Sequence, residues 1–387
     1  MYIERDLTER LRNAAETRPS LIVTGARQVG KTTLLKSAFP EAEYITFDSL
    51  LNLASAKEAP QAFLERFNGP LILDEIQYVP GLFPALKQKI DQDRDAPGRY
   101  LLTGSQRFEL LKNISESLAG RIAVLRLESL SAREIGRCPD IDTRVFPSII
   151  IRGGYPELWK NPRIDPADWF EDYFRTYLER DLRELVQVKS LVEFRRFLGM
   201  AASRAGELVN FSDLAQAVGV SNNTIKTWMA ALEISGLVYI LPPYFSNMGK
   251  RLVKLPKLFF ADTGLLAALL GIRTLEQLDS SAFAGHVWEN FVLSELVKSS
   301  GAMPGKDLFF YRDHGGVEVD FLIETREGLT LIEAKYSERI RAEGLSFDRV
   351  TSRLAAKIIR CRVAAPTGLR QALPMVGYDI YDPRYEY

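Results

Sequence analysis

The feature that most constrains the fold of this chain is a glycine-rich segment, G-A-R-Q-V-G-K-T, at residues 25–32. It matches the spacing G-x-x-x-x-G-K-[ST], follows an apolar run at 21–24 and precedes a helical pattern at 32–38. Glycines at these positions let the backbone close around phosphate, and the N–H groups that begin the helix point at anionic oxygens. The segment therefore predicts a phosphate-binding loop (P-loop) between a strand and a helix.

Two side chains of the P-loop have specific expected roles. We expect Lys31 to reach the β- and γ-phosphates of a nucleotide, and the Thr32 hydroxyl to bind Mg²⁺. The predicted nucleotide-binding residues are Gly25, Ala26, Arg27, Gln28, Val29, Gly30, Lys31, Thr32 and Thr33.

A second apolar run, 71–73, ends in two acids, Asp74 and Glu75. Carboxylates at the carboxyl end of a buried strand lie at the edge of the sheet where ligands bind. We expect Asp74 to hold Mg²⁺ through water, and Glu75 to polarise the attacking water. The alternative is a solvated acidic turn without a catalytic role.

A third apolar run, 100–102, ends in small polar residues that include Ser105. P-loop proteins with a catalytic acid beside the Mg²⁺ acid insert such a strand between the P-loop strand and the acidic strand, so Ser105 could face the γ-phosphate as a sensor. Arg121, just before the next apolar run, could act as an arginine finger or sensor, in cis or in trans. A surface salt bridge is an equally open alternative for Arg121.

The first 135 residues alternate short apolar runs with helical patterns. The five runs are 21–23, 44–47, 71–73, 100–102 and 122–125. Continuous apolar runs separated by helices are typical of a parallel sheet covered on both faces. We therefore expect a doubly wound α/β ATPase domain at 1–135, a connector and helical region at 136–205, a winged-helix-like domain at 206–262 and a further α/β domain at 263–387.

The expected winged helix-turn-helix rests on a helix that begins near Phe211, a glycine-containing turn at 218–221, a second helix and a strand at 236–241. Its candidate recognition helix, 221–235, offers Asn222, Asn223 and Lys226, which is a thin set for reading a major groove. A helical module for packing or for a protein partner is the slightly favoured alternative to direct DNA binding.

Composition excludes several classes of protein. The chain has 387 residues, 50 Lys+Arg and 50 Asp+Glu, so neither wholesale disorder nor a globally basic nucleic-acid coat is expected. The charged start of the chain, 1–6, and the absence of a long apolar run predict neither a signal peptide nor a transmembrane helix. We therefore expect a cytoplasmic protein with no membrane partner. With only 2 Cys and 2 His, a zinc site is not expected, and carboxylate–Mg²⁺ chemistry is the main catalytic option.

The chain resembles the bacterial and archaeal AAA-type P-loop ATPases that carry a C-terminal domain of unknown function. The matching segments are G-A-R-Q-V-G-K-T-T-L (25–34), D-E-I-Q-Y-V-P-G-L-F (74–83), L-T-G-S-Q (102–106), L-A-G-R (118–121), G-G-Y-P-E (153–157), Y-L-E-R-D-L (177–182), K-L-F-F-A-D-T-G-L (257–265) and W-E-N (288–290). They span nearly the whole chain in the order of the family. The resemblance implies ATP and Mg²⁺ as cofactors and ATP hydrolysis as the activity, but it implies no cellular task.

Four residues of the last third form a second candidate site. Glu289 lies in a predicted helix, Asp320 in a predicted strand, and Glu333 and Lys335 end the next strand. This order resembles restriction-endonuclease-like folds of the PD-(D/E)XK type, as does the C-terminal domain of the family. The resemblance implies that Asp320 and Glu333 bind Mg²⁺ with Glu289 completing the shell, and that Lys335 positions the attacking water. The alternative is a set of structural ion pairs.

The leading hypothesis is therefore a Mg²⁺-dependent ATPase whose C-terminal nuclease-like domain acts on or binds DNA or RNA. In the alternative hypothesis, the protein is an ATP-dependent regulatory or interaction protein with a catalytically silent nuclease-like domain. A third hypothesis is a signalling ATPase that forms a homo-oligomer when it binds ATP.

Overall fold

The structure is a computed structural model that describes residues 1–94, 96–105, 116–141, 148–178, 191–245, 255–337, 345–354, 356–365 and 379–381. The chain divides into two compact units, which are described separately. The N-terminal unit holds 2–129 with 234–236, and the C-terminal unit holds Met1, 130–233 and 237–387. The expected domain boundaries near 205 and 262 therefore fall inside one compact unit.

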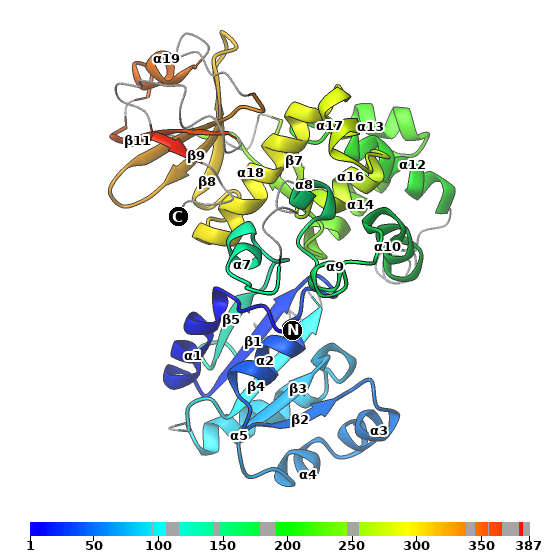
Figure 1. Cartoon of the computed structure of the whole chain (residues 1–387). Coiled ribbons are helices and arrows are strands. Elements are labelled where there is room, and N and C mark those ends of the chain that lie inside the picture. Colours follow the sequence, from blue (N-terminus) through cyan, green and yellow to red (C-terminus); the bar gives the residue numbers. More distant parts are fainter. Residues whose placement is uncertain are drawn as a thin grey trace. The chain divides into compact units, whose positions relative to one another are not determined.

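The N-terminal unit is built on a parallel sheet of five strands in the order β2-β3-β4-β1-β5. Its strands, drawn in blue and cyan in Figure 1, are β1 (Ser20–Gly25), β2 (Glu43–Thr46), β3 (Leu71–Asp74), β4 (Tyr100–Ser105) and β5 (Ile122–Arg126). All five strands predicted for this region are present. The sheet also confirms that β4 lies between the P-loop strand β1 and the acidic strand β3.

Short helices connect these strands. They are α1 (Leu7–Thr17), α2 (Lys31–Ala38), α3 (Leu50–Glu58), α4 (Pro60–Glu65), the 3₁₀ turn η1 (Ile76–Tyr78) and α5 (Leu82–Gln92). Apolar side chains of the sheet and of α3 to α5 share one buried core, in which Phe63, Phe83 and Leu86 are at most 1% exposed. Burial of each such side chain stabilises the fold by about 2 kcal/mol. The core fixes the strand order, and the carboxyl ends of β1, β3 and β4 consequently meet at one edge.

The C-terminal unit begins with helices. They are α7 (Ala132–Gly136), α8 (Ile149–Arg152), α9 (Pro156–Lys160), α10 (Pro166–Tyr173), the π-helical turn η3 (Phe174–Leu178), α12 (Leu191–Ala202), α13 (Phe211–Val218), α14 (Asn222–Ile234), α16 (Thr263–Leu269), α17 (Leu275–Ser280) and α18 (Ala284–Ser300). Residues 142–147, which are part of the expected connector, lie outside the described residues. So do residues 179–190, which include the last four residues of the Y-L-E-R-D-L segment.

The expected helix, turn, helix and strand appear as α13, α14 and β6 (Val238–Leu241), which pairs antiparallel with β7 (Lys257–Phe260). The Asn210 side chain caps α13, and Gly219 ends the helix in a left-handed conformation at φ 87°. Trp228 on α14 packs against Phe194 and Phe197 of α12. The apolar face of α14 is thus buried in the helical region, and only its polar face, with Lys226, is exposed.

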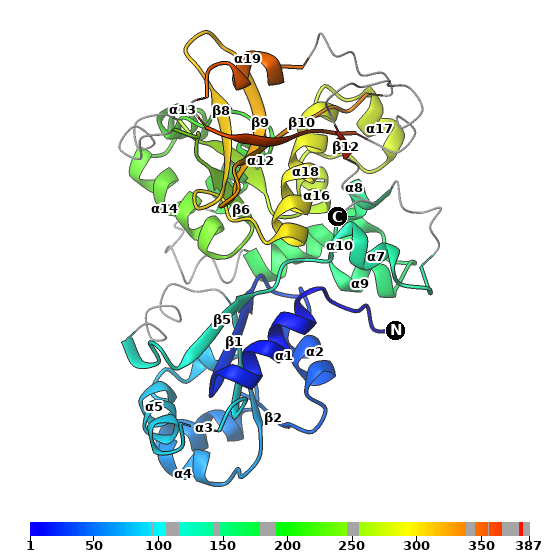
Figure 2. The same ribbon diagram turned by 90° about the vertical axis from the view of Figure 1, so that its left-hand side faces the viewer.

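The last third forms a mixed sheet in the order β12-β11-β10-β9-β8. Its strands are β8 (Leu308–Arg312), β9 (Glu318–Glu324), β10 (Leu329–Ala334), β11 (Ile358–Ala364) and β12 (Asp379–Tyr381). Strands β8, β9 and β10 are antiparallel neighbours, while β10, β11 and β12 run parallel (Figure 2). The helix α19 (Phe347–Thr351) lies between β10 and β11 along the chain.

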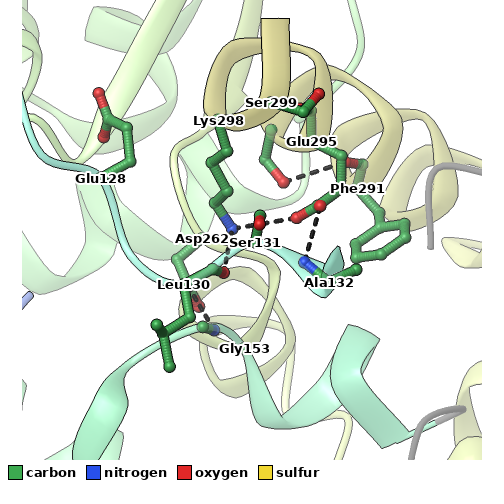
Figure 3. A network of polar contacts seen from close by, with 12 residues as sticks. Glu128, Leu130, Ser131, Ala132, Gly153, Asp262, Phe291, Glu295, Lys298 and Ser299 are labelled. Carbon is green, nitrogen blue, oxygen red and sulfur yellow. Dashed lines mark hydrogen bonds and ion pairs between the residues drawn. The ribbon is translucent and has the colours of Figure 1, made fainter. Parts of the chain in front are cut away.

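The long helix α18 holds the chain segment that follows β5 (Figure 3). The buried Glu295 carboxylate accepts a hydrogen bond of 2.8 Å from the Ala132 backbone N–H, and Lys298 Nζ donates to Leu130 O at 3.2 Å. Ser131 and Glu134 cap the start of α7 reciprocally. These bonds satisfy the backbone groups at the entry to the C-terminal unit.

Across the residues described, none of the helices is both long and apolar enough to cross a membrane.

Candidate functional site

The P-loop lies between β1 and α2 and has the backbone that its sequence predicts. Gln28 and Gly30 have positive φ angles of 61° and 96°. Gly25 has φ 149°, and a Cβ atom there would lie 2.1 Å from the carbonyl oxygen of Leu127. Only glycine fits this position, because the chain that continues β5 passes directly over the first residue of the loop.

Lys31 is buried against the loop itself. Its Nζ donates to Ala26 O at 2.8 Å and to Gly25 O at 3.2 Å, which are neutral acceptors. Burial lowers the pKa of Lys31 to about 8, although the nearby carboxylates of Glu75 and Asp74 oppose this shift. A buried ammonium group whose hydrogen-bond partners are neutral is poised to bind an anion such as phosphate.

Three hydroxyl groups converge on the buried Asp74 carboxylate. Thr32 Oγ1 donates to Oδ1 at 2.7 Å, Tyr44 Oη donates to Oδ2 at 2.9 Å, and Thr103 Oγ1 also donates to Oδ1. Burial and the bond to Asp74 raise the pKa of Tyr44 to about 12. A carboxylate oxygen beside a threonine hydroxyl at the start of α2 is a donor set that suits Mg²⁺, so these residues fit the ion that the P-loop implies.

Glu75 follows Asp74 in a left-handed conformation at φ 58°, which is uncommon for glutamate. Its backbone N–H donates to Thr103 Oγ1 at 3.2 Å, and the Gln77 amide donates to its Oε2. Thr103 therefore contacts both acids. Backbone strain at an acid beside a nucleotide-binding loop is consistent with a functional position.

The structure separates the two other residues predicted for this site. Ser105 pairs in register with Gly25, so its backbone lies beside the P-loop. Arg121 precedes β5 at the opposite end of the sheet, because Ile122 pairs with Ser20 at the start of β1. Arg121 there forms two bonds to Asp91, of 2.7 and 2.9 Å. This position agrees with the salt-bridge alternative and not with contact between Arg121 and the γ-phosphate of its own chain.

Sequence reasoning missed three residues of this site: Tyr44, Thr103 and Arg5. Arg5 is buried and donates to Val29 O in the P-loop at 2.8 Å and to Glu128 O at 2.7 Å. Tyr44 and Thr103 lie in predicted strands. The alternation of side chains between the two faces of each strand is the signal that could have identified them. No local pattern pointed to Arg5.

In the C-terminal unit, the structure brings together all four residues of the second candidate site. Strands β9 and β10 form the expected hairpin, with Ile332 opposite Phe321. The backbone N–H of Ala334 donates to Asp320 Oδ2 at 2.8 Å, and Lys335 Nζ lies 3.0 Å from Glu333 Oε2. The Ser346 backbone N–H also donates to Glu333.

Two further residues, Lys257 and Glu318, belong to the same cluster and were not predicted. Lys257 Nζ lies 2.8 Å from Glu289 Oε1 and 2.5 Å from Glu318 Oε1, and its side chain is 5% exposed. Burial lowers the pKa of Lys257, but Glu289, Asp320 and Glu318 outweigh it and raise the pKa above its usual range. We call Lys257, Glu289, Glu318, Asp320, Glu333 and Lys335 the carboxylate–lysine cluster.

Burial dominates the electrostatics of the acids in this cluster. It raises the pKa of Glu289 to about 7, against the opposing charge of Lys257. Burial likewise raises the pKa of Asp320 and of Glu333. For Lys335, burial is outweighed by Asp320 and Glu333, so its pKa is raised. The cluster thus holds four acids and two lysines, and each lysine is paired with at least one of the acids.

The carboxylate–lysine cluster does not fit a divalent ion as arranged. Within the described ranges, no group of three Asp, Glu, His or Cys side chains could hold a metal ion. The metal set expected from the sequence, Glu289, Asp320 and Glu333, is divided because Glu289 faces Lys257 and Glu333 faces Lys335. The structure thus agrees with the ion-pair alternative for these residues.

Two segments of the family resemblance, G-G-Y-P-E and K-L-F-F-A-D-T-G-L, contribute to the fold at this point. Asp262, in K-L-F-F-A-D-T-G-L, accepts hydrogen bonds from Gly264 and Leu265 at the start of α16 and from Gly154 N at 2.8 Å. A Cβ atom on Gly153 would lie 2.1 Å from Asp262 Oδ1. Gly153, Gly154, Asp262 and Gly264 therefore build a tight junction between α8 and α16.

Three family models match the chain. An AAA domain matches residues 17–136, a domain of unknown function (DUF8612) matches 143–276, and another domain of unknown function (DUF4143) matches 284–375. The chain is 35% identical to the uncharacterized protein Rv2008c of Mycobacterium tuberculosis over 84% of its own length and 72% of that protein. The same values hold for the uncharacterized protein Mb2031c of Mycobacterium bovis.

The matches to solved structures are weak. The Walker-type ATPase PABY2304 of Pyrococcus abyssi is 16% identical with a TM-score of 0.46, covering 69% of this chain and 96% of that chain. The RuvB Holliday junction branch migration motor of Thermotoga maritima is 18% identical with a TM-score of 0.34, covering 62% and 90%. The AAA domain match and the P-loop geometry, not these likenesses, identify the N-terminal unit as an AAA-type P-loop ATPase domain.

Proposed function

The chain belongs to the same family as the uncharacterized mycobacterial proteins Rv2008c and Mb2031c, and from its AAA domain we propose that it binds Mg²⁺-ATP and hydrolyses it. The observation that carries the proposal is the convergence of Lys31, Thr32 and Asp74 at the carboxyl edge of the parallel sheet. A chance glycine-rich turn would not bring the Asp74 carboxylate to 2.7 Å from the Thr32 hydroxyl.

Each residue of the site has a defined task in this reaction. The N–H groups of the P-loop and Lys31 bind the phosphates, and Lys31 exchanges its carbonyl partners for phosphate oxygens. Thr32 and Asp74 would hold Mg²⁺, which neutralises the charge that develops on the phosphates when it is bound. Glu75 orients the attacking water, and Thr103 fixes the angle between the two acids through its bonds to both.

ATP turnover by the purified full-length chain tests this proposal. We expect Mg²⁺-dependent release of phosphate by the wild type, and a loss of at least about 100-fold in Lys31→Ala, because the cation that binds the transferred phosphate is removed. Lys57→Ala is the control, since Lys57 is an exposed lysine on α3 of the same unit. Equal turnover in the wild type and Lys31→Ala would contradict the proposal.

For the C-terminal unit, we propose that the nuclease-like domain is catalytically silent and serves as the effector that binds a nucleic acid or a protein under control of the ATPase. The carboxylate–lysine cluster supports this alternative over cleavage, because three of its four acids are already in ion pairs with its two lysines. The exposed polar face of α14, with Asn222, Asn223 and Lys226, supports at most a weak contribution to DNA binding.

Incubation with DNA and RNA, with Mg²⁺ or Mn²⁺ and with or without ATP, tests the silent role. We expect no cleavage by the wild type and none by Asp320→Ala or Lys335→Ala. Metal-dependent cleavage that both substitutions abolish would establish the nuclease and refute the silent role. Cleavage that both substitutions leave unchanged would indicate a contaminating nuclease.

A further inference from the structure

Lys257 is the one residue of the carboxylate–lysine cluster that comes from outside the nuclease-like region. It lies in the stretch matched by DUF8612, whereas its partners Glu289 and Glu318 lie in the stretch matched by DUF4143. Its ammonium group is 2.8 Å from one carboxylate and 2.5 Å from the other. A cation from one region is therefore bound by the acids of the next region.

The backbone around Lys257 holds this cation in a fixed position. On one edge, β7 pairs with β6, with Lys257 opposite Leu241. On the other edge, Leu258 O accepts from Gly206 N at 2.7 Å, and the Asn290 side chain bonds both N and O of Phe260 at 2.7 and 2.8 Å. Because both edges of the strand are bonded, the backbone of Lys257 has a fixed position, from which its side chain reaches Glu289 and Glu318.

The carboxylates around Lys257 already have partners. Glu289 Oε1 lies 2.8 Å from Lys257 Nζ. Glu318 binds Lys257 and also lies 3.4 Å from Arg312 Nη1. Asp320 accepts a backbone N–H, and Glu333 binds Lys335. A divalent ion placed among these acids would lie against a buried ammonium group of the same sign.

We propose that the ammonium group of Lys257, bound by Glu289 and Glu318, is the resident cation of this site and takes the role that a divalent metal ion has in the fold the sequence resembles. The inference rests on the proposed silent role of the domain and gives its cause. The acids bind their own chain, join the region at 143–276 to the region at 284–375, and take up no metal. Lys335 is left facing Glu333, with no metal-bound water to position.

Binding of Mn²⁺ to the full-length, nucleotide-free protein tests this inference, followed by the electron paramagnetic resonance signal of the free ion. Asp74→Asn serves as the reference protein, since it removes the carboxylate of the P-loop site. We expect no bound Mn²⁺ at millimolar concentration in the reference. We expect one bound ion per chain when Lys257→Met is added, and its loss when Asp320→Asn is added to that protein.

Lys298→Met in the reference protein is the matched control. Lys298 is also a buried lysine that binds a carboxylate of α18, Glu295, but it lies outside the cluster. It should gain no Mn²⁺. If both lysine variants bound Mn²⁺, the binding would be explained by a nonspecific loosening of the fold, and the inference would be overturned.

Two other results would also overturn it. One is that the reference protein binds Mn²⁺ and loses this binding when Asp320→Asn is added. This comparison does not need the Lys257→Met protein, so it holds even if that protein fails to fold. The other is a folded Lys257→Met protein that gains no ion. No part of the experiment uses ATP or nucleic acid. The Mn²⁺ result can therefore be interpreted even if the ATPase proposal or the effector proposal is wrong.

Discussion

Each unit of the molecule contains a buried lysine close to buried acids, but the two lysines have opposite partners. Lys31 donates to neutral carbonyl groups, and its pKa is lowered to about 8 by burial. Lys257 contacts carboxylates, and its pKa is raised because those carboxylates outweigh burial. The acids differ in the same sense, since Asp74 is bonded by hydroxyls and Glu289 by an ammonium group.

This difference distinguishes a site that awaits a ligand from one that is complete. Hydroxyls and carbonyls are neutral, so a phosphate or a cation can displace or join them without separating charges. A buried ion pair offsets part of the desolvation cost of its two charges, and removal of either partner leaves the other uncompensated. The same residue types, lysine and carboxylate, thus predict opposite responses to mutation in the two units.

The largest expected difference between the two sites appears when one acid in each unit is replaced by its neutral amide. Asp74→Asn should lower ATP turnover by about 10²- to 10³-fold, because the residue would hold Mg²⁺ against the phosphates. Asp320→Asn should leave turnover at the wild-type value. Phosphate release at saturating Mg²⁺-ATP measures both. A fall in Asp320→Asn, with the protein folded, would show that the two sites are not independent.

The next largest effect concerns stability. Glu289→Ala removes one carboxylate from the buried Lys257 and should destabilise the fold by about 3 kcal/mol, the cost of leaving a buried charge with fewer partners. Thermal unfolding followed by circular dichroism measures the change in midpoint. Glu327→Ala, in the exposed turn between β9 and β10, is the control and should not move it. An unchanged midpoint for Glu289→Ala would mean that Lys257 does not depend on this partner.

The low pKa of Lys31 predicts how nucleotide affinity depends on pH. The triphosphate binds the protonated lysine, and protonation in the free protein is lost as pH rises through about 8. Affinity should therefore be flat below this pH and fall above it by up to about tenfold per pH unit. Titration calorimetry with a slowly hydrolysed ATP analogue measures the profile. Lys31→Arg should bind with no such fall, and an equal fall in that variant would assign the effect to another group.

The smallest expected effect tests the hydroxyl partners of Asp74. Tyr44→Phe removes one neutral donor from the carboxylate and should raise the Mg²⁺ concentration for half-maximal turnover by about fivefold, equivalent to roughly 1 kcal/mol. Turnover at saturating Mg²⁺ should stay close to the wild type, since the ion restores the position of Asp74. A large loss at saturating Mg²⁺ would show that Tyr44 acts in the reaction and does not only position the acid.

The N-terminal site could be largely predicted because its signals are local. Lys31 and Thr32 follow from a single segment, and Asp74 follows from its place at the end of an apolar strand. Parallel strands bring their carboxyl ends to one edge, so these segments had to meet. The hairpin that brings Asp320 beside Glu333 also follows from sequence, since the spacing between two strands allows a turn and a return.

The partners of those residues could not be predicted, because they depend on contacts distant in sequence. Tyr44 and Thr103 have ordinary strand positions, and only the order β2-β3-β4 brings their hydroxyls to Asp74. Lys257 looks like any lysine that begins a strand, and nothing near it in sequence indicates that α18 and β9 supply its carboxylates. The pattern of acids predicted a metal site because the compensating cation was not visible in it.

The position of Lys257 in β7 has a consequence for how accurately this strand must fold. Side chains of a strand alternate between its two faces, so a slip of one residue exchanges the faces. A slip of β7 would turn the apolar Leu258 toward the carboxylates of Glu289 and Glu318 and carry Lys257 to the other side. The amide of Asn290 and the N–H of Gly206 bond backbone atoms of the strand, which every residue offers, so they cannot select the alignment. The side chains select it, because only one alignment pairs Lys257 with the acids of α18 and β9.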